Sequence, residues 1–279
     1  MSDQIKLGLV TDAAPIEEIA KGWDFFEIPC QFHIMPMHSE VKWAASRDRY
    51  RAVGVPTPVA SHYIGGDDPT SGFGAFASGP GYDREQELFW ASRAFRRMHE
   101  IGVKVVGVWG GMFRRPDGYP IAKAWDDAIS FCNIVADEGE RWGIKIALEP
   151  NADPETLFPS YTEGLKFVQS VGRDSVRLMV DIMYFVKLGE SFDLIRQYPE
   201  MCLHVQVAGA GHGGHSQTNL EPRTKEYGEL FQALHDVGYT ETVSVAAPWF
   251  STNGADPIDW NYETTQTLKY MQDLRAKFW

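Results

Sequence analysis

The chain has 279 residues, of which 44% are hydrophobic, with nine Trp and sixteen Phe, and 23% are charged. This composition is typical of a soluble globular protein and excludes a disordered chain. The formal charge of -12 argues against nucleic acid or an anionic membrane as a partner, because both require a basic surface, and it leaves a small molecule as the expected partner.

The sequence shows no targeting signal. Residues 1–6 lack the apolar core of a secretory signal, and no apolar run approaches the roughly 20 residues of a membrane span. A cytoplasmic protein is therefore expected. Cys30, Cys132 and Cys202 are scattered, which favours neither a disulfide framework nor a thiolate zinc site.

Short apolar runs rich in β-branched residues alternate with longer amphipathic stretches. This alternation indicates repeated βα units and a parallel sheet. Eight such units are the number that closes a (β/α)8 TIM barrel, so the sequence predicts one TIM-barrel domain over residues 1–279. The predicted strands lie near residues 5–10, 24–29, 57–62, 103–109, 144–149, 176–181, 202–207 and 242–247.

The intervening stretches carry helix signals. Asp83 is predicted to begin a helix, Ser160 with Glu163 forms a capping box for another, and Gly143 and Gly172 are predicted to end helices. The apolar face of the first of these helices is predicted to contain Leu88, Ala91, Phe95 and Met98. Homo-oligomerisation is a further hypothesis, based on aromatic side chains expected at the surface: Trp43, Trp90, Trp142 and residues 277–279.

Four candidate site residues lie in the first half of the chain. Glu27 near the end of the second strand reaches the barrel mouth or forms a salt bridge, and His62 at the end of the third strand is a candidate catalytic acid or base. Trp109, before two glycines, is a candidate for stacking on a sugar, with core packing as the alternative. Arg115 is a candidate clamp for an anionic group, with a surface turn as the alternative.

Three further candidates end the fifth, sixth and seventh strands. Glu149, Asp181 and Gln206 are expected at the mouth, the edge where the C-terminal ends of the strands meet. Two carboxylates and an amide oxygen suit Mn²⁺ or Mg²⁺, although unrelated polar residues would give the same pattern. The alternation of side chains places His204 on the same face as Gln206, so His204 is a candidate catalytic residue.

The last two candidates lie in loops. His212 belongs to a glycine-rich loop and is a candidate substrate contact, for which a solvated loop is the alternative. Trp249 follows the eighth strand and is a candidate contact for the aglycone of a glycoside, with an incidental surface aromatic as the alternative.

Four segments resemble the sugar phosphate isomerase/epimerase family, the xylose-isomerase-like TIM barrels: residues 147–150, 180–181, 203–208 and 238–245. In that family a Glu, an Asp, a His and a second Glu on the last four strands hold a divalent metal. Glu149 and Asp181 match this set. Gln206 stands in place of the His, and Ala246 stands in place of the second Glu.

The resemblance implies a carbohydrate-modifying enzyme, an isomerase/epimerase or lyase that abstracts a proton beside a carbonyl of a sugar or oxidised glycoside, assisted by Mn²⁺ or Mg²⁺. Two-base epimerisation lacks its second carboxylate at Ala246, whereas one-base isomerisation or β-elimination needs fewer carboxylates, and a His can complete it. Three alternatives stay open: a metal-independent isomerase that uses His, a non-catalytic sugar-binding protein, and a glycosidase that uses Glu149 and Glu27.

Overall fold

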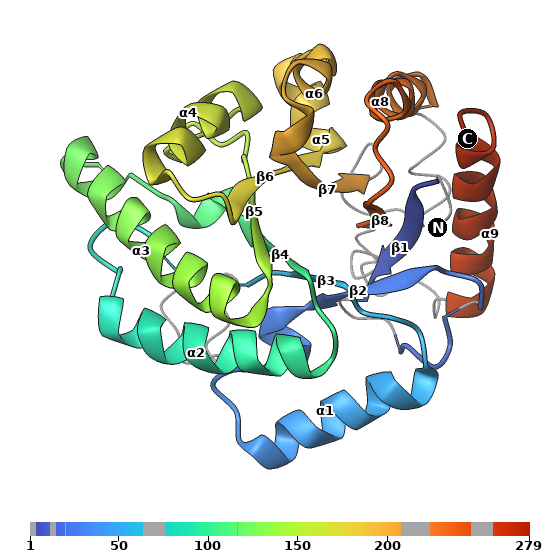
Figure 1. Cartoon of the computed structure of the whole chain (residues 1–279), viewed down its shortest axis with the longest axis horizontal. Coiled ribbons are helices and arrows are strands. Elements are labelled where there is room, and N and C mark those ends of the chain that lie inside the picture. Colours follow the sequence, from blue (N-terminus) through green and yellow to red (C-terminus); the bar gives the residue numbers. More distant parts are fainter. Residues whose placement is uncertain are drawn as a thin grey trace.

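A closed barrel of eight parallel strands forms the centre of the molecule in the computed structural model of the chain (Figure 1). Neighbouring strands pair in sequence order, and β8 closes the barrel against β1. The strands are β1 (Lys6–Val10), β2 (Phe25–Pro29), β3 (Val59–Ser61), β4 (Val105–Trp109), β5 (Lys145–Glu149), β6 (Val176–Asp181), β7 (Cys202–Val207) and β8 (Thr242–Val245). The structure describes residues 4–11, 15–19, 21–63, 76–115, 117–207, 224–246 and 259–279.

Helices surround the barrel, and α9, which carries the C-terminal end of the chain, lies beside β1 (Figure 1). This arrangement confirms the predicted TIM barrel, and every strand falls inside its predicted range. The helices are α1 (Glu40–Val53), α2 (Arg84–Glu100), α3 (Ile121–Trp142), α4 (Tyr161–Val171), α5 (Ile182–Leu188), α6 (Asp193–Gln197), α8 (Thr224–Asp236) and α9 (Trp260–Arg275). Single turns of other helix types follow β2, follow β4 and precede β7: η1 (Cys30–Ile34), η2 (Gly110–Met112) and η3 (Pro199–Met201).

The predicted helix ends are confirmed by their hydrogen bonds. The side chain of Asp83 accepts from two backbone N–H groups at the start of α2, and that of Ser160 accepts from the N–H of Glu163 at the start of α4. Gly143 and Gly172 follow α3 and α4 with φ angles of 68° and 67°, the left-handed conformation that glycine adopts most readily.

The buried face of α2 differs from the prediction at one position. Leu88 is 42% exposed, whereas the neighbouring Glu87 is 1% exposed and faces the core. Glu87 is accommodated there because its carboxyl accepts a hydrogen bond of 2.8 Å from the hydroxyl of Tyr63. Burial raises the pKa of Glu87 well above its usual value, so this side chain is held neutral inside the protein.

The aromatic surface expected to support self-association is absent at two of its positions. Trp43 and Trp90 are 1% and 2% exposed in the hydrophobic core, and their indole N–H groups donate to Glu100 and to the carbonyl of Tyr63. At the chain end, Trp279 packs against Phe231 of α8. The expected exposure of Trp43 and Trp90 was therefore wrong, and homo-oligomerisation stays a prediction.

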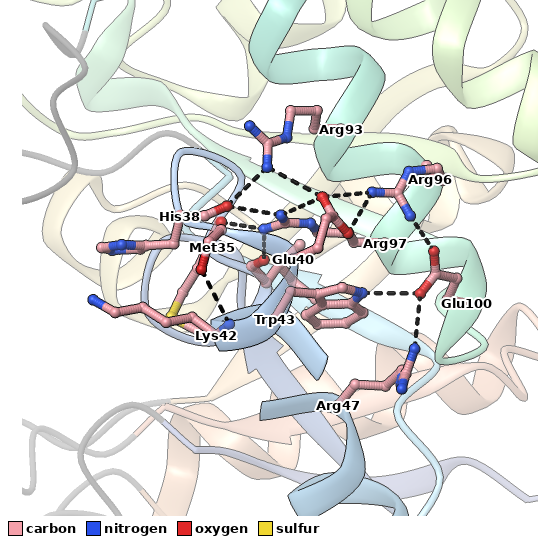
Figure 2. Close-up of polar contacts among 12 residues, drawn as sticks. Met35, His38, Glu40, Lys42, Trp43, Arg47, Arg93, Arg96, Arg97 and Glu100 are labelled. Carbon is pink, nitrogen blue, oxygen red and sulfur yellow. Dashed lines mark hydrogen bonds and ion pairs between the residues drawn. The ribbon is translucent and has the colours of Figure 1, made fainter. Parts of the chain in front are cut away.

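Arg97 of α2 holds the segment between β2 and α1. Its guanidinium is fully buried and donates to the carbonyls of Ile34, Met35 and His38 and, at 2.7 Å, to the carboxylate of Glu40 (Figure 2). Hydrogen bonding to Arg97 lowers the pKa of Glu40 to about 2, so the pair stays charged. The first loop after β2 is thus fastened to the second helix.

The strand register sets which side chains meet inside the barrel. Trp109 of β4 lies opposite Glu149 of β5. The β6–β7 pair shifts register after Leu178, and beyond the shift Asp181 lies opposite Gln206. Within the described residues, no helix is long and apolar enough to cross a membrane.

Candidate functional site

Two carboxyl groups lie together at the mouth of the barrel. Glu149 and Asp181 end β5 and β6 and are 9% and 6% exposed, and the negative charge of Asp181 acts on the carboxyl of Glu149. One oxygen of Asp181 also accepts from the N–H of Met183 at 2.7 Å, because Asp181 is the N-cap of α5. The cap fixes the direction of Asp181, while its carboxyl stays next to Glu149.

The electrostatics of this pair are unfavourable unless a positive charge joins it. Burial raises the pKa of Glu149 well above its usual value, and the negative charges of Asp181 and Glu27 raise it further. Two buried carboxyl groups this close together are stable only if they share a proton or if a cation neutralises their charge. Carboxylate oxygens are the ligands that hard divalent cations prefer, so the pair fits such an ion.

Glu27 forms the centre of a second polar cluster, inside the barrel. It is fully buried and accepts hydrogen bonds from Gln206 Nε2 at 2.5 Å, from the hydroxyl of Ser244, and from His204 Nε2 at 2.9 Å. Burial alone would raise the pKa of Glu27, but His204 and the hydroxyl of Ser244 bring it below its usual value. Glu27 is therefore the anionic member of this cluster.

From the sequence, Glu27 was a candidate for the barrel mouth, for a salt bridge or for the second carboxylate of a glycosidase. Its carboxylate lies 2.9 Å from His204 Nε2, the kind of contact that the salt-bridge alternative supposed, but in the barrel interior. The glycosidase alternative required Glu27 to reach a sugar beside Glu149, and its 0% exposure contradicts that role. The sequence did contain a signal for this cluster. Alternation along β7 places His204 and Gln206 on one face, and two buried polar side chains need a further polar group as a hydrogen-bond partner.

His204 lies within the same cluster. Its Nδ1 lies 2.8 Å from the hydroxyl of Thr242, its Nε2 contacts Glu27 and Ser244, and the side chain is 0% exposed. Both ring nitrogens are thus engaged by the protein itself. The catalytic role of His204 stays a prediction. The structure places its imidazole among Glu27, Thr242 and Ser244 in the barrel interior.

Tyr184 joins the mouth from α5 and was not singled out in the sequence. Its hydroxyl accepts from Trp109 Nε1 at 3.2 Å. Burial raises its pKa, and the charges of Glu149 and Asp181 add to the shift, so the hydroxyl keeps its proton. Asp181 was the available signal, because an N-cap at that position places residue 184 in the first turn of the following helix.

Gly110 shows why the chain needs glycine directly after β4. A Cβ atom at this position would lie 2.1 Å from the carbonyl oxygen of Glu149. The backbone of the β4 loop therefore passes against the end of β5, and only a residue without a side chain fits there.

The remaining predicted residues are less closely tied to these clusters. His62 is half-buried at the end of β3, with a left-handed φ of 46° that is uncommon outside glycine. Arg115 is exposed and donates to the carbonyl of Pro154, which fastens two mouth loops together. His212 and Trp249 lie outside the described residues. The roles predicted for all four stay predictions.

The protein is thus a TIM barrel with a buried pair of carboxyl groups at its mouth. The chain matches the family described as xylose isomerase-like TIM barrel over residues 17–274. Because that match spans most of the sequence, the chain belongs to this family, which confirms the resemblance seen in the sequence.

Known relatives include sugar epimerases. D-psicose 3-epimerase of Agrobacterium fabrum (strain C58 / ATCC 33970) is 28% identical over 164 residues, 56% of this chain and 52% of that protein. The match thus spans about half the length of this curated relative. Low sequence identity accompanies a shared fold in two solved structures. D-psicose 3-epimerase in the presence of D-fructose has a TM-score of 0.75 at 20% identity, covering 98% of this chain and 100% of the other. Apo 3-keto-D-glucoside 4-epimerase YcjR from E. coli has a TM-score of 0.70 at 16% identity, with the same coverage.

Proposed function

We propose that this protein is a carbohydrate-modifying enzyme, an isomerase/epimerase or lyase that removes a proton from the carbon beside a carbonyl. The observation that carries the proposal is the buried pair Glu149 and Asp181 at the mouth. Membership of the xylose isomerase-like family and the epimerase relatives support a sugar as the substrate. A keto-sugar or a glycoside oxidised to a ketone carries the required acidic C–H bond.

A divalent cation, Mn²⁺ or Mg²⁺, is part of this proposal. Glu149, Asp181 and the side-chain oxygen of Gln206 would hold it. Within the described residues, no group of three or more His, Cys, Asp or Glu side chains is placed to hold a metal, and Gln206 is the donor of another type that we propose beside the carboxyl pair. When bound, the cation would polarise the substrate's carbonyl and lower the pKa of the neighbouring C–H group.

Glu149 is the proposed base. Its carboxylate takes the proton from carbon, and the bonding electrons move toward the carbonyl oxygen. This role requires the ionised form of Glu149, which a cation bound at the pair would favour. Tyr184 is a suitable donor to the oxygen that gains charge, because its hydroxyl accepts from Trp109 and keeps its own proton for donation.

The end of β8 favours reactions with one base. Ala246 follows β8, its N–H donates to the carbonyl of Val207, and its methyl side chain cannot transfer a proton. In isomerisation, Glu149 returns the same proton to the neighbouring carbon, while the hydroxyl proton on that carbon passes to the former carbonyl oxygen. In β-elimination, the electron pair expels a leaving group from the carbon next to the deprotonated one. Both reactions need only Glu149 as the base, and they are the two chemical routes included in the proposal.

Metal content tests the proposal. We expect the purified protein to hold close to one Mn²⁺ or Mg²⁺ per chain by mass spectrometry after loading, and Glu149→Gln and Asp181→Asn to lose it. We also expect Glu149→Gln to lose turnover of keto-sugars while staying folded. A wild-type protein that takes up neither ion would contradict the metal, and turnover retained in Glu149→Gln would contradict the base.

A further inference from the structure

We infer that Glu27 is a positioning residue that orients the amide of Gln206, so that the oxygen of this amide is presented to the carboxyl pair at the mouth. The inference rests on the proposed function, because it assigns Gln206 as the neutral oxygen donor beside Glu149 and Asp181. It also explains why a fully buried glutamate lies inside the barrel, where it contacts Gln206 rather than the mouth.

The first step follows from the chemistry of the two groups. An ionised carboxylate has only acceptor atoms, so the group of Gln206 that lies 2.5 Å from Glu27 Oε1 has to be the NH₂. The amide is planar, with its oxygen and nitrogen on different sides of the carbon. Anchoring the nitrogen therefore turns the oxygen away from Glu27.

The second step is that the anchor cannot rotate. The other oxygen of Glu27 accepts from Ser244 and from His204 Nε2, and His204 is itself held by Thr242. All of these side chains lie on β2, β7 and β8, which are paired strands or close neighbours in the barrel wall. The direction of the Gln206 amide is therefore set by the strand framework.

The third step places the oxygen beside the carboxyl pair. Gln206 lies opposite Asp181 in the β6–β7 ladder, and residues paired in this way point to the same face of a sheet. An amide oxygen adds a hard donor without adding a third negative charge. Two carboxylates and one neutral oxygen balance a divalent cation in charge and match the preference of Mn²⁺ and Mg²⁺ for oxygen.

The test is a set of Mn²⁺ titrations of the metal-stripped protein by calorimetry. We expect Glu27→Gln to weaken Mn²⁺ binding by about tenfold, as loss of a partner of a metal ligand commonly does. We expect Gln206→Leu to weaken binding as well, and the double variant to bind no more weakly than Gln206→Leu alone. Glu87→Gln is the matched control, a buried glutamate on α2 bonded to Tyr63, and it should bind as the wild type does.

A spectroscopic readout separates positioning from a general structural effect. The visible absorption of bound Co²⁺ reports its ligands, and we expect Glu27→Gln to change this spectrum in the same direction as Gln206→Leu. If Glu27→Gln does not fold, Ser244→Ala removes one of the groups that fix Glu27 and should weaken Mn²⁺ binding by a smaller factor.

Two outcomes would overturn the inference, and they are distinguishable. If the wild-type protein binds Mn²⁺ and folded Glu27→Gln binds it equally well, or the two substitutions weaken binding additively, Glu27 does not act through Gln206 and the proposed function still stands. If the wild-type protein binds no Mn²⁺, both the metal site and the role of Glu27 are overturned together.

Discussion

Gln206 gives the mouth a neutral amide at the position where the family resemblance implies a histidine. Its nitrogen is committed to Glu27, and its strand neighbour is Asp181. An imidazole at this position would also be able to donate one N–H to Glu27, leaving its other nitrogen for a metal. In many metalloproteins a metal-bound histidine donates its other ring N–H to a carboxylate.

Gln206→His should therefore bind metal more tightly, and the gain should be larger for Zn²⁺ than for Mn²⁺, because imidazole is the better ligand for zinc. We expect a gain of about tenfold for Zn²⁺, on the scale of the effects seen at metal-ligand partners. Calorimetric titration of the stripped variant with each ion measures this. Equal affinity in variant and wild type would show that β7 does not reach the ion.

The carboxyl pair shows which residues could be predicted from the sequence. Glu149 and Asp181 each end an apolar run, a local pattern that is visible without any knowledge of partners. Glu27 and His204 lie 177 residues apart and meet only because the barrel closes. The direction of a buried side chain, and therefore the cluster around Glu27, depends on contacts that no local pattern contains.

Among the elements, α2 is the helix whose packing differs from its sequence pattern. Glu87 occupies the buried face beside Tyr63, while Arg97, further along the same helix, binds the loop after β2 (Figure 2). The apolar periodicity of α2 predicted its existence and its N-cap. The exact face was not predictable, because two polar side chains on it are satisfied by partners in distant loops.

Glu87 gives the protein a pH-dependent stability. The pKa of Glu87 is raised in the folded state by burial, whereas the unfolded value is about 4.3. Between these two values the folded chain binds more protons than the unfolded chain, so raising the pH lowers the free energy of unfolding. The contribution is complete below the unfolded pKa and is lost as the pH rises toward the folded pKa.

The matched variant is Glu87→Gln, which keeps the shape and removes the titration. We expect the free energy of unfolding of the wild type, relative to this variant, to fall as the pH rises above the unfolded pKa of glutamate, at a rate of at most about 1.4 kcal/mol per pH unit. Urea unfolding at several pH values measures the difference. Parallel curves for the two proteins would show that Glu87 does not keep its proton in the folded state.

At the scale of the whole molecule, the sequence predicted the architecture well. Alternation of apolar runs and amphipathic stretches is repeated along the chain, and a barrel is the arrangement that uses all of these units. The exposure of Trp43 and Trp90 was not predictable from helix position, because large aromatic side chains between helix and barrel are buried by neighbours that are distant in sequence.

Metal binding should stabilise the entire fold, because the proposed ligands lie on three neighbouring strands that separate on unfolding. A ligand at 100 times its dissociation constant stabilises a protein by about 2.7 kcal/mol. We expect Mn²⁺ to raise the unfolding temperature of the stripped wild type and to leave that of Glu149→Gln unchanged. Differential scanning calorimetry gives both values, and an equal rise in the two proteins would place the ion elsewhere.

The register shift between β6 and β7 has a consequence for how this protein can change. The pairing passes from Leu178 with Cys202 to Met179 with His204, so Leu203 is an extra residue in β7. If β6 and β7 paired without this shift, Asp181 would lie opposite Val205, and an apolar side chain would stand beside the carboxyl pair. Substitutions can alter this mouth one group at a time, whereas a change of the β6–β7 register by one residue would exchange its polar lining for an apolar one. The spacing of residues along β7 is therefore as much a part of the site as their identities.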